Sequence, residues 1–279
     1  MAGFARSALM RRRDLPFQCF SQRAITVIFL LMIRLFASGF LAISVLLFSG
    51  LILPAPAGAV EVSATSPAIV IGFVGGFIKH NDALHTEVKM AARLRKEYGS
   101  SVVVDTFENR NGDKAYQEIV TVLDTNHDGT LSTEEKSNAR IILYGHSWGA
   151  SETIALARRL EKDGIPVLLT VQVDSVGKLG ENDEVIPSNV AQAVNFYQLD
   201  GFLHGEPQIR AANASRTQIL GNYRFSYAAS PYNCANYPWY ARIFMKAHTQ
   251  IECDSKVWNQ VESLIRAHLL PAQKNESAP

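Results

Sequence analysis

Residues 140–149 read RIILYGHSWG and decide how this chain folds. The first five form a short apolar run of strand type, and residues 150–160 space apolar side chains three and four positions apart, which indicates a helix. Gly145 and Gly149 allow the backbone to make a sharp elbow between these elements without Cβ clashes. A serine on such an elbow points its hydroxyl out of the fold. The pattern G-x-S-x-G therefore predicts Ser147 as a catalytic nucleophile; the alternative is a tight turn with a spectator serine.

Strands and helices alternate along the rest of the sequence. The expected strands cover residues 68–74, 101–106, 165–173, 194–198 and 217–220, and the expected helices cover 82–97, 115–123 and 254–270. Near-continuous apolar strands separated by helices indicate an α/β fold with a mostly parallel sheet and helices on both faces. Active sites in such sheets lie at the carboxyl ends of the strands, and Ser147 follows one of these ends. A single domain over residues 68–270 accounts for all of these elements.

The elbow and the order of elements resemble the α/β-hydrolase family. The resemblance covers most of residues 68–270 in element order, and the elbow is its one specific motif. It implies an α/β-hydrolase-like fold with nucleophile, acid and base in the chain order Ser, Asp or Glu, His. His248, before the closing helix, stands where the family places its base; the alternative is an ordinary loop histidine. His146 is next to the serine, but we expect its side chain to leave the turn in another direction.

Two aspartates compete for the role of the acid. Asp174 ends the strand after the elbow helix, and Asp200 ends the next strand. The family most often uses the later position, while some lipases use the earlier one. Asp174 follows the stronger strand, which would fix its carboxylate better, so we favour Asp174 and keep Asp200 as the alternative. The acid would hold the tautomer of the histidine and stabilise the imidazolium.

Two backbone N–H groups would have to stabilise the oxyanion of the reaction. The resemblance assigns one to Trp148, the residue after the serine, and the other to the loop after the first strand. Gly75 and Gly76 in that loop allow the close backbone approach that such a pocket requires. We expect Phe73 or Val74 to be the second donor. The alternative is a plain turn at the end of a strand.

Residues 223–244 are rich in tyrosine, tryptophan and phenylalanine and lead directly to His248. Two interpretations fit this segment equally well. One is an aromatic-lined pocket for an apolar acyl group, and the other is a packed irregular loop. In the first case the substrate would be a small-molecule or lipid-like carboxylic ester.

Residues 124–135 read DTNHDGTLSTEE and match the calcium-loop pattern D-x-[DN]-x-[DN]-G-x₅-E without a gap. The expected ligands are side-chain oxygens, one backbone carbonyl and a bidentate glutamate, supplied by Asp124, Asn126, Asp128, Thr130, Ser132 and Glu135. The sequence resembles an EF-hand here, but it has one loop and a short exit helix over residues 133–139. A structural Ca²⁺ ion therefore fits better than a sensor, and we expect no organic cofactor. The alternative is a turn without metal.

The first 59 residues differ from the rest of the chain. Basic residues lead into a long apolar run over 24–53, and residues 57–59 form an A-x-A cleavage site. This predicts a signal peptide over 1–59, of ordinary length if translation starts at Met32; the alternative is an uncleaved membrane anchor. Residues 60–67 are the expected linker, and residues 271–279 a flexible tail. In both cases the folded part would be extracytoplasmic, periplasmic or secreted, and would contact a membrane only through an uncleaved leader.

Two cysteines remain after the leader, Cys234 and Cys253. An even number of cysteines in an oxidising compartment favours a disulfide bond between them. Such a bond would close a loop of about 20 residues, which corresponds to roughly 3 kcal/mol in the chain-entropy model. The alternative is two buried free thiols.

Charge and motifs together define two functional hypotheses. The formal net charge of +1 gives no indication of a nucleic-acid partner. The first hypothesis is an exported serine hydrolase of the esterase or lipase type, in which Ser147 attacks a carboxylic ester, His248 moves the proton and Asp174 orients His248. The second is a non-catalytic extracytoplasmic calcium-binding protein on a hydrolase scaffold, because a fold does not fix a function.

Overall fold

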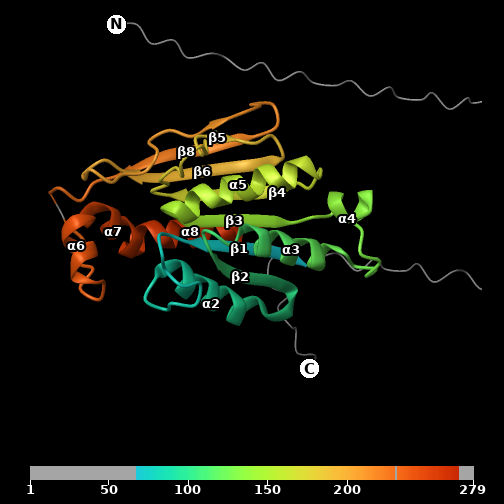
Figure 1. Ribbon diagram of the computed structural model, residues 1–279, viewed down its shortest axis with the longest axis horizontal. Coiled ribbons are helices and arrows are strands. Elements are labelled where there is room, and N and C mark those ends of the chain that lie inside the picture. Colours follow the sequence, from blue (N-terminus) through green and yellow to red (C-terminus); the bar gives the residue numbers. More distant parts are fainter. Residues whose placement is uncertain (1–66, 230, 270–279) are drawn as a thin grey trace, which may run out of the picture. The chain divides into compact units, whose positions relative to one another are not determined.

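A six-stranded parallel sheet forms the centre of the computed structural model, which describes residues 67–229 and 231–269 (Figure 1). The strand order is β2-β1-β3-β4-β6-β8, and every neighbouring pair is parallel. The strands are β1 (Ala68–Val74), β2 (Val102–Glu108), β3 (Ile141–His146), β4 (Val167–Val173), β6 (Val190–Gln198) and β8 (Gln218–Phe225). Two short strands, β5 (Val185–Ile186) and β7 (Arg210–Ala211), pair separately. The predicted leader, nearly all of the linker, and the tail lie outside the described residues.

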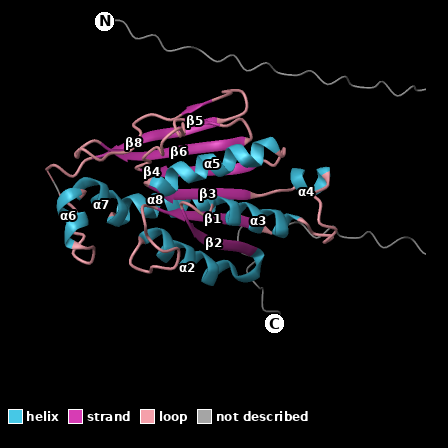
Figure 2. Cartoon of the chain, viewed as in Figure 1, coloured by secondary structure: helices cyan, strands magenta, loops and turns pink. Residues whose placement is uncertain are grey.

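Helices cover both faces of the sheet (Figure 2). On one face, α3 (Gly112–Leu123) and α5 (Trp148–Lys162) share an apolar core with the strands. On the other face, the core includes α2 (Thr86–Tyr98), α7 (Lys246–Cys253) and α8 (Ser255–His268). The predicted α/β-hydrolase-like architecture, a mostly parallel sheet between two helical layers, is confirmed.

Strand β1 shows why the central strands are apolar throughout. All of its seven residues are buried. Ile69, Ile71 and Phe73 belong to the core under α3 and α5, whereas Ala68 and Val70 belong to the core on the opposite face. Successive side chains of a strand point to opposite faces, so a strand covered on both sides needs apolar residues at both sets of positions.

The strand order reverses between β1 and β3, which pair with each other at the middle of the sheet. In doubly wound sheets, ligands bind at the carboxyl ends of the strands beside such a reversal. The helix α7 and the short helix α6 (Trp239–Phe244) lie at this carboxyl edge (Figure 1). The short helix α4 (Thr133–Ser137) and the loop before it lie at the opposite edge, where β3 begins.

Two elements differ from the sequence-based expectation in ways that matter for the site. Helix α2 begins at Thr86 and not at Asp82, because Asp82 forms a turn in which its carboxylate accepts the backbone N–H of Leu84 over 3.0 Å. His248 precedes the closing helix α8, as expected, but it lies inside a short helix of its own, α7, and not in a loop. The segment has too few apolar residues to reveal a helix by periodicity. Among the described residues, no helix has the length and apolar character needed to cross a bilayer.

The edge strand β8 is also longer than its apolar pattern indicates. The sequence pattern predicts residues 217–220, but the strand continues to Phe225. Tyr223 and Arg224, in its second half, are exposed to solvent. Backbone pairing with β6 carries the strand through these positions, and Tyr223 stacks on Phe196 of β6 with ring centroids 5.5 Å apart.

Candidate active site

The elbow holds Ser147 in a strained backbone conformation. β3 ends at His146 and α5 begins at Trp148, so Ser147 alone makes the turn. Its φ of 58° and ψ of −128° are values that residues with a side chain rarely adopt. The Ser147 N–H donates to the carbonyl of Val173, and its carbonyl accepts the N–H of Ala150, each over 3.0 Å. Such strain persists only where the surrounding structure enforces it, and it is typical of functional sites.

Three glycines make room for the elbow. A Cβ on Gly145 would lie 2.5 Å from the backbone of Gly149, and a Cβ on Gly149 would collide with the carbonyl oxygen of Phe73. A Cβ on Gly75 would lie only 2.9 Å from the Cβ of Ser147. The glycines are therefore required by close backbone approach, and the loop after β1 lies directly against the serine.

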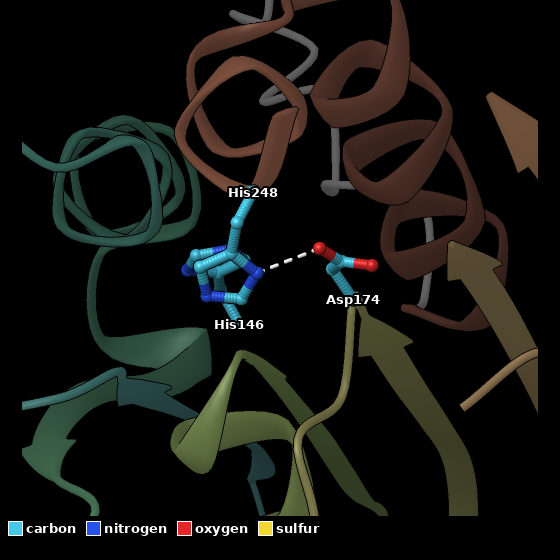
Figure 3. A group of neighbouring side chains, drawn as sticks. All are labelled: His146, Asp174 and His248. Carbon is cyan, nitrogen blue, oxygen red and sulfur yellow. Dashed lines mark hydrogen bonds and ion pairs between the residues drawn. The ribbon is translucent and has the colours of Figure 1, made fainter. Parts of the chain in front are cut away.

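Asp174 and His248 form a buried hydrogen-bonded pair (Figure 3). His248 Nδ1 lies 2.6 Å from Asp174 Oδ2. Asp174 directly follows β4, has a φ of 46° and is fully buried. Its oxygens also accept the backbone and side-chain N–H of Gln198, over 3.2 and 2.8 Å, and the backbone N–H of Gly205 over 2.7 Å. These donors give the carboxylate one orientation, which in turn orients the imidazole of His248.

Asp200, the alternative acid, belongs to a different network. Its Oδ2 accepts the hydroxyl of Ser226 over 2.9 Å and the backbone N–H groups of Tyr227 and Ala228. These contacts tie the end of β6 to the segment after β8. The geometry therefore favours Asp174 over Asp200 as the acid.

The nucleophile and the base lie at the same edge of the sheet but are not hydrogen-bonded to each other. Within the described part of the chain, the Ser147 hydroxyl makes no hydrogen bond with His248, whose Nδ1 is bonded to Asp174. Ser147 is 9% exposed. Catalytic hydrogen bonds are often long in structures without substrate and shorten when substrate binds. The predicted oxyanion donors lie around the serine: Trp148 begins α5, and Phe73 and Val74 are the last residues of β1.

His146 contacts the base, which the sequence did not reveal. Its ring centroid lies 4.5 Å from that of His248, and the two planes are tilted by 33° (Figure 3). His146 and Tyr144 occupy alternate positions of β3, and Tyr144 belongs to the core beneath α2 and α7. The side chain therefore leaves the elbow towards those helices, as the backbone geometry requires, and this direction brings it to His248.

Beyond His146 lies a group of buried charged residues that sequence reasoning missed. His146 Nδ1 lies 3.8 Å from Glu87 Oε1 and 3.6 Å from Glu252 Oε2. His85 Nδ1 contacts Glu252 Oε1. All four side chains are buried. The one signal in the sequence is the four-residue spacing of His248 and Glu252, which places both on the same side of α7.

Burial sets the protonation states of this group. It lowers the pKa of His146 to about 4. Burial and the charge of Glu252 raise the pKa of Glu87 to about 8. Burial alone would also raise the pKa of Glu252, but the facing His146 and the hydrogen bond with His85 outweigh it and lower this pKa. The surroundings therefore favour the neutral forms of His146 and Glu87 and the ionised form of Glu252.

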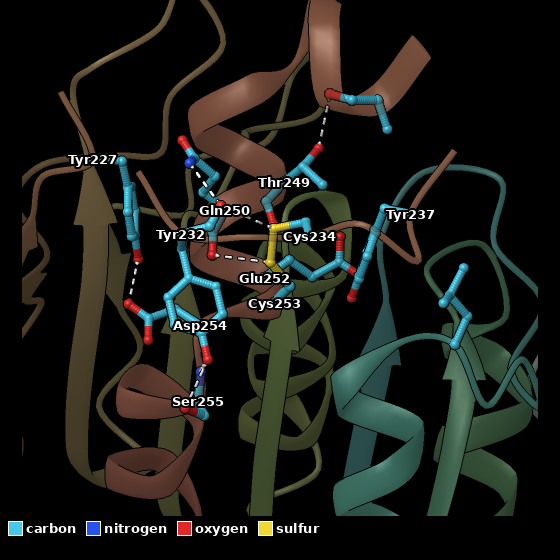
Figure 4. The surroundings of a disulfide bond; sticks show 12 residues. Tyr227, Tyr232, Cys234, Tyr237, Thr249, Gln250, Glu252, Cys253, Asp254 and Ser255 are labelled. Carbon is cyan, nitrogen blue, oxygen red and sulfur yellow. Dashed lines mark hydrogen bonds between the residues drawn. A yellow bond between two sulfur atoms is a disulfide. The ribbon is translucent and has the colours of Figure 1, made fainter. Parts of the chain in front are cut away.

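A disulfide bond joins Cys234 to Cys253, as the sequence predicts (Figure 4). Their Cα atoms are 6.0 Å apart. Cys253 is the last residue of α7, the helix that carries His248. In the loop that the bond closes, Tyr237 donates its hydroxyl to Glu252 over 3.2 Å. The disulfide therefore fixes the end of the helix that positions the base.

The aromatic segment serves partly as framework and partly as exposed surface. Tyr227 and Tyr237 are buried, which fits the packed-loop interpretation. Trp239 and Phe244 on α6 are 61% and 62% exposed. Beside them, a cavity of about 280 Å³ is lined by Phe202, Leu203, Tyr227, Ile243, Phe244 and Met245, among others. Asp200, Lys246 and Gln250 also line it, so a cavity of mixed polar and apolar character lies next to the amino end of α7, close in sequence to His248.

The predicted calcium loop has the backbone geometry of its motif. Gly129, at the sixth position, has a φ of 82°, which is the left-handed turn that the motif requires. Asp124 accepts the backbone N–H groups of Asp128 and Gly129, over 3.2 and 3.0 Å. Glu135, at the twelfth position, accepts the N–H of Ser132 over 2.9 Å and forms a capping box with it at the start of α4. The acidic side chains are therefore turned into the loop.

The side chains of Asn126 and Asp128 also bond to the backbone of this loop. Asn126 Oδ1 accepts the N–H of Asp128 over 3.0 Å, and Asp128 Oδ1 accepts the N–H of Thr130 over 2.8 Å. The hydrogen bonds from Ser132, both backbone and side chain, lower the pKa of Glu135 to about 2. Glu135 is thus ionised at neutral pH, as a cation ligand must be.

Comparisons with known proteins do not assign a function to this site. The chain matches no protein-family model and no curated protein. Among solved structures, it is similar to a thioesterase from the prodiginine biosynthetic pathway of Streptomyces coelicolor, with 9% identity over 77% of this chain and 97% of that chain and a TM-score of 0.36. It is similar to a cutinase-like protein from Cryptococcus sp., with 12% identity over 74% and 96% and a TM-score of 0.35. An arylesterase matches with 16% identity over 40% of this chain and 38% of its own, with a TM-score of 0.28. Scores this low carry no argument about function.

Proposed function

We propose that this protein is a serine hydrolase of carboxylic esters. The observation that carries the proposal is the buried hydrogen bond of 2.6 Å between Asp174 and His248 beside a strained elbow serine. A pair of this kind, with a serine at the same edge of the sheet, is the arrangement of a Ser-His-Asp triad. The roles of nucleophile, base and acid fall to Ser147, His248 and Asp174.

In the proposed reaction, the Ser147 Oγ attacks the ester carbonyl carbon while His248 Nε2 takes the hydroxyl proton. His248 then gives this proton to the leaving alkoxide, and an acyl-enzyme remains on Ser147. A water molecule, deprotonated by the same nitrogen, attacks the acyl-enzyme; the carboxylic acid leaves and the serine recovers its proton. Asp174 holds His248 Nδ1–H throughout and stabilises the imidazolium.

The surroundings of His248 favour this proton transfer. Because burial lowers the pKa of His146 to about 4, the ring packed against His248 is uncharged at neutral pH. It places no positive charge beside the imidazolium that forms during the reaction. The backbone N–H of Trp148, at the first turn of α5, is the proposed first oxyanion donor, and Phe73 or Val74 would supply the second.

The proposed substrate has an apolar acyl or alcohol part. Phe77, in the loop after β1, is 85% exposed and packs edge-on against Trp148, with ring centroids 5.7 Å apart. The cavity of about 280 Å³ beside α7, which is of mixed polarity, presents Phe202, Ile243 and Phe244 as a second place for such a group. Exposed aromatic side chains around a polar reaction centre suit a small-molecule or lipid-like ester.

We also propose that the 124–135 loop holds a structural Ca²⁺ ion. The inward-turned oxygens and the left-handed Gly129 support this, because the loop needs little rearrangement to exchange internal hydrogen bonds for the ion. The proposed ligands are the side chains of Asp124, Asn126, Asp128 and Glu135, the carbonyl of Thr130, and Ser132 directly or through water. The ion would stabilise the loop and supply no chemistry to the reaction.

Export of the folded domain is likewise proposed. The A-x-A site and the apolar run of the first 59 residues support it, and the disulfide bond suits an oxidising compartment.

A fluorophosphonate probe tests the enzymatic proposal directly. We expect the folded, calcium-loaded protein to be labelled at Ser147, with the adduct located by peptide mass spectrometry, and the Ser147→Ala variant to remain unlabelled. In wild-type protein, labelling by the probe should abolish active-site titration and ester turnover together. Folded protein that is neither labelled nor active would instead support a non-catalytic calcium-binding protein.

A further inference from the structure

Three separate segments bring four metal-binding side chains together beneath the elbow. His85 and Glu87 lie at the start of α2, His146 ends β3, and Glu252 lies on α7. One ligand atom from each of His85, Glu87 and Glu252 lies within 4.8 Å of the other two. His146 Nδ1 lies 3.8 Å from Glu87 Oε1 and 3.6 Å from Glu252 Oε2. His146 thus adjoins this group of three through both of its carboxylates; we call the four side chains the His₂Glu₂ cluster.

Two members of the cluster lack the partners that buried polar groups require. Both carboxylate oxygens of Glu87 and both ring nitrogens of His146 make no hydrogen bond within the described residues. Glu87 is 0% exposed and His146 is 2% exposed, so bulk water does not reach them. Native proteins rarely leave buried polar atoms without a partner. Of these atoms, His146 Nδ1 and Glu87 Oε1 face each other across 3.8 Å, and a shared ligand would satisfy both.

We propose that the His₂Glu₂ cluster binds one divalent transition-metal ion of the zinc class. Zinc prefers four ligands drawn from His nitrogen and carboxylate oxygen, at about 2.0–2.2 Å from the ion. A tetrahedron of that size has ligand–ligand edges of about 3.4 Å. The two distances from His146 Nδ1 to Glu87 and Glu252, 3.8 and 3.6 Å, are longer than this by only a few tenths of an ångström.

The charge and chemistry of the cluster select the ion. Two ionised carboxylates neutralise a divalent cation, and two neutral imidazoles complete the set. Ca²⁺ takes six to eight oxygen ligands, so a site that is half imidazole disfavours it. Mixed nitrogen and oxygen ligands favour zinc and its neighbours among the transition metals. The cluster and the 124–135 loop would therefore bind different ions.

Outer contacts support the ligands in the way that metal sites require. His85 Nε2 lies 3.9 Å from Asp82 Oδ2, on the side of the ring away from the Nδ1 that meets Glu252. Tyr237 donates its hydroxyl to Glu252 over 3.2 Å. Metal-binding histidines usually direct their second nitrogen to a carboxylate, and ligating carboxylates usually accept a further hydrogen bond.

The ion would connect the two halves of the proposed triad; this consequence rests on the proposed hydrolase function. His146 directly precedes Ser147, and Glu252 lies one helical turn after His248. An ion shared by His146 and Glu252 would fix the strand of the nucleophile relative to the helix of the base. Four protein ligands leave no open position for water, so the ion is structural and the ligands act as positioning residues.

The test measures zinc binding by the full-length protein after removal of metal with a chelator. We expect one Zn²⁺ per chain by elemental mass spectrometry after dialysis, with submicromolar affinity in competition with a chromophoric chelator. Co²⁺ in its place should give the visible absorption of a four-coordinate ion. Glu87→Gln, which has nearly the shape of the protonated side chain, should weaken zinc binding at least about 100-fold, since even outer-contact mutations cost 10–100-fold. Glu135→Gln is the matched control and should bind zinc like the wild type, because it alters only the calcium loop.

Several results would overturn this site. If the wild-type protein binds no zinc at micromolar Zn²⁺ concentrations, the proposed site is refuted and no variant is needed. Equal zinc binding by wild type and by folded Glu87→Gln would also refute it, and Glu252→Gln provides the same comparison if Glu87→Gln does not fold. Ser147→Ala should bind zinc normally. Zinc bound by a protein that fluorophosphonate does not label would therefore refute the hydrolase function and leave the metal site in place.

Discussion

The two ends of β3 carry two groups of acidic side chains that are built in opposite ways. At its amino end, the loop of residues 124–135 turns the carboxylates of Asp124, Asp128 and Glu135 onto the backbone of its own twelve residues. At its carboxyl end, His146 meets Glu87 and Glu252, which come from helices far apart in the sequence. The loop is largely exposed and internally satisfied. The carboxyl-end group is buried, and the oxygens of Glu87 have no hydrogen-bond partner there.

This difference separates activity from stability. β3 has six residues, which corresponds to about 20 Å, so an ion in the loop cannot touch a substrate at Ser147. Changes at the carboxyl end should therefore affect turnover far more than folding. Changes at the amino end should affect folding and leave the reaction intact in protein that remains folded.

The largest effect is expected at the carboxyl end. Ser147→Ala and His248→Ala should each lower kcat for ester hydrolysis by at least about 10⁴-fold, because members of a triad act as a unit. The double variant should be no slower than the worse single variant. Steady-state kinetics on a chromogenic ester gives the rates, and thermal unfolding of each variant shows whether the fold is kept. Substantial activity in folded Ser147→Ala would refute the nucleophile.

The choice between the two aspartates sharpens this prediction. Asp174→Asn should lower kcat by about 10⁴-fold, because the amide favours the wrong tautomer of His248. Asp200→Asn is the matched control, and we expect its kcat to stay within a few-fold of wild type, since the Asp200 carboxylate pairs with Arg224 of β8 and with the segment after β8. The opposite pattern in kcat would move the acid to Asp200.

The disulfide bond at the end of α7 should have an intermediate effect. Opening it should lower the free energy of unfolding by roughly 3 kcal/mol. Because Cys253 ends the helix that carries His248, activity should fall at temperatures where the reduced domain is still folded. Activity and circular dichroism followed together during reduction provide the measurement, with a Cys234→Ser/Cys253→Ser variant as the reductant control. Reduced protein with unchanged activity would show that the bond does not position the base.

At the amino end, calcium should act on stability alone. At a concentration about 100-fold above its Kd, Ca²⁺ would stabilise the fold by about 2.7 kcal/mol. For a domain of this size, that raises the melting temperature by roughly 5–10 °C. Calorimetric titration and thermal unfolding measure binding and stabilisation, and Asp124→Ala/Glu135→Gln should show neither. If chelation abolished turnover while the protein stayed folded, the separation of the two ends would be wrong.

The smallest effect concerns the pH dependence of the empty loop. Hydrogen bonds from Ser132 lower the pKa of Glu135 from 4.5 to about 2 in the folded chain. A lowered folded-state pKa contributes stability above the unfolded pKa and loses it as pH falls through the folded pKa. Without calcium, wild type should therefore exceed Glu135→Gln in stability at neutral pH, and the difference should shrink between pH 4.5 and 2. Denaturant unfolding across this range measures it, and a constant difference would contradict the assignment.

The sequence alone determined the features that depend on neighbouring residues. The apolar runs around Ser147 and the glycines beside it specify a strand, an elbow and a helix, because the steric demands of that turn are local. The predicted calcium loop is equally local, since residues 124–135 supply both the turn at Gly129 and every expected ligand of the proposed ion. The alternating pattern of strands and helices was enough for the layered parallel fold, because burial on both faces requires apolar strands.

Only the tertiary structure decided which distant residues meet. Asp174 and Asp200 both end strands, and only the packing of α7 against the sheet shows which one reaches His248. The sequence gives no sign that His146 meets His248. The contact follows from the side-chain alternation of β3 together with the position of α7. Glu87 and Glu252 read as ordinary helical glutamates, since a polar residue gives no sign in the sequence that it will be buried. Such clusters depend on long-range packing, and that packing is what the linear pattern of residues does not contain.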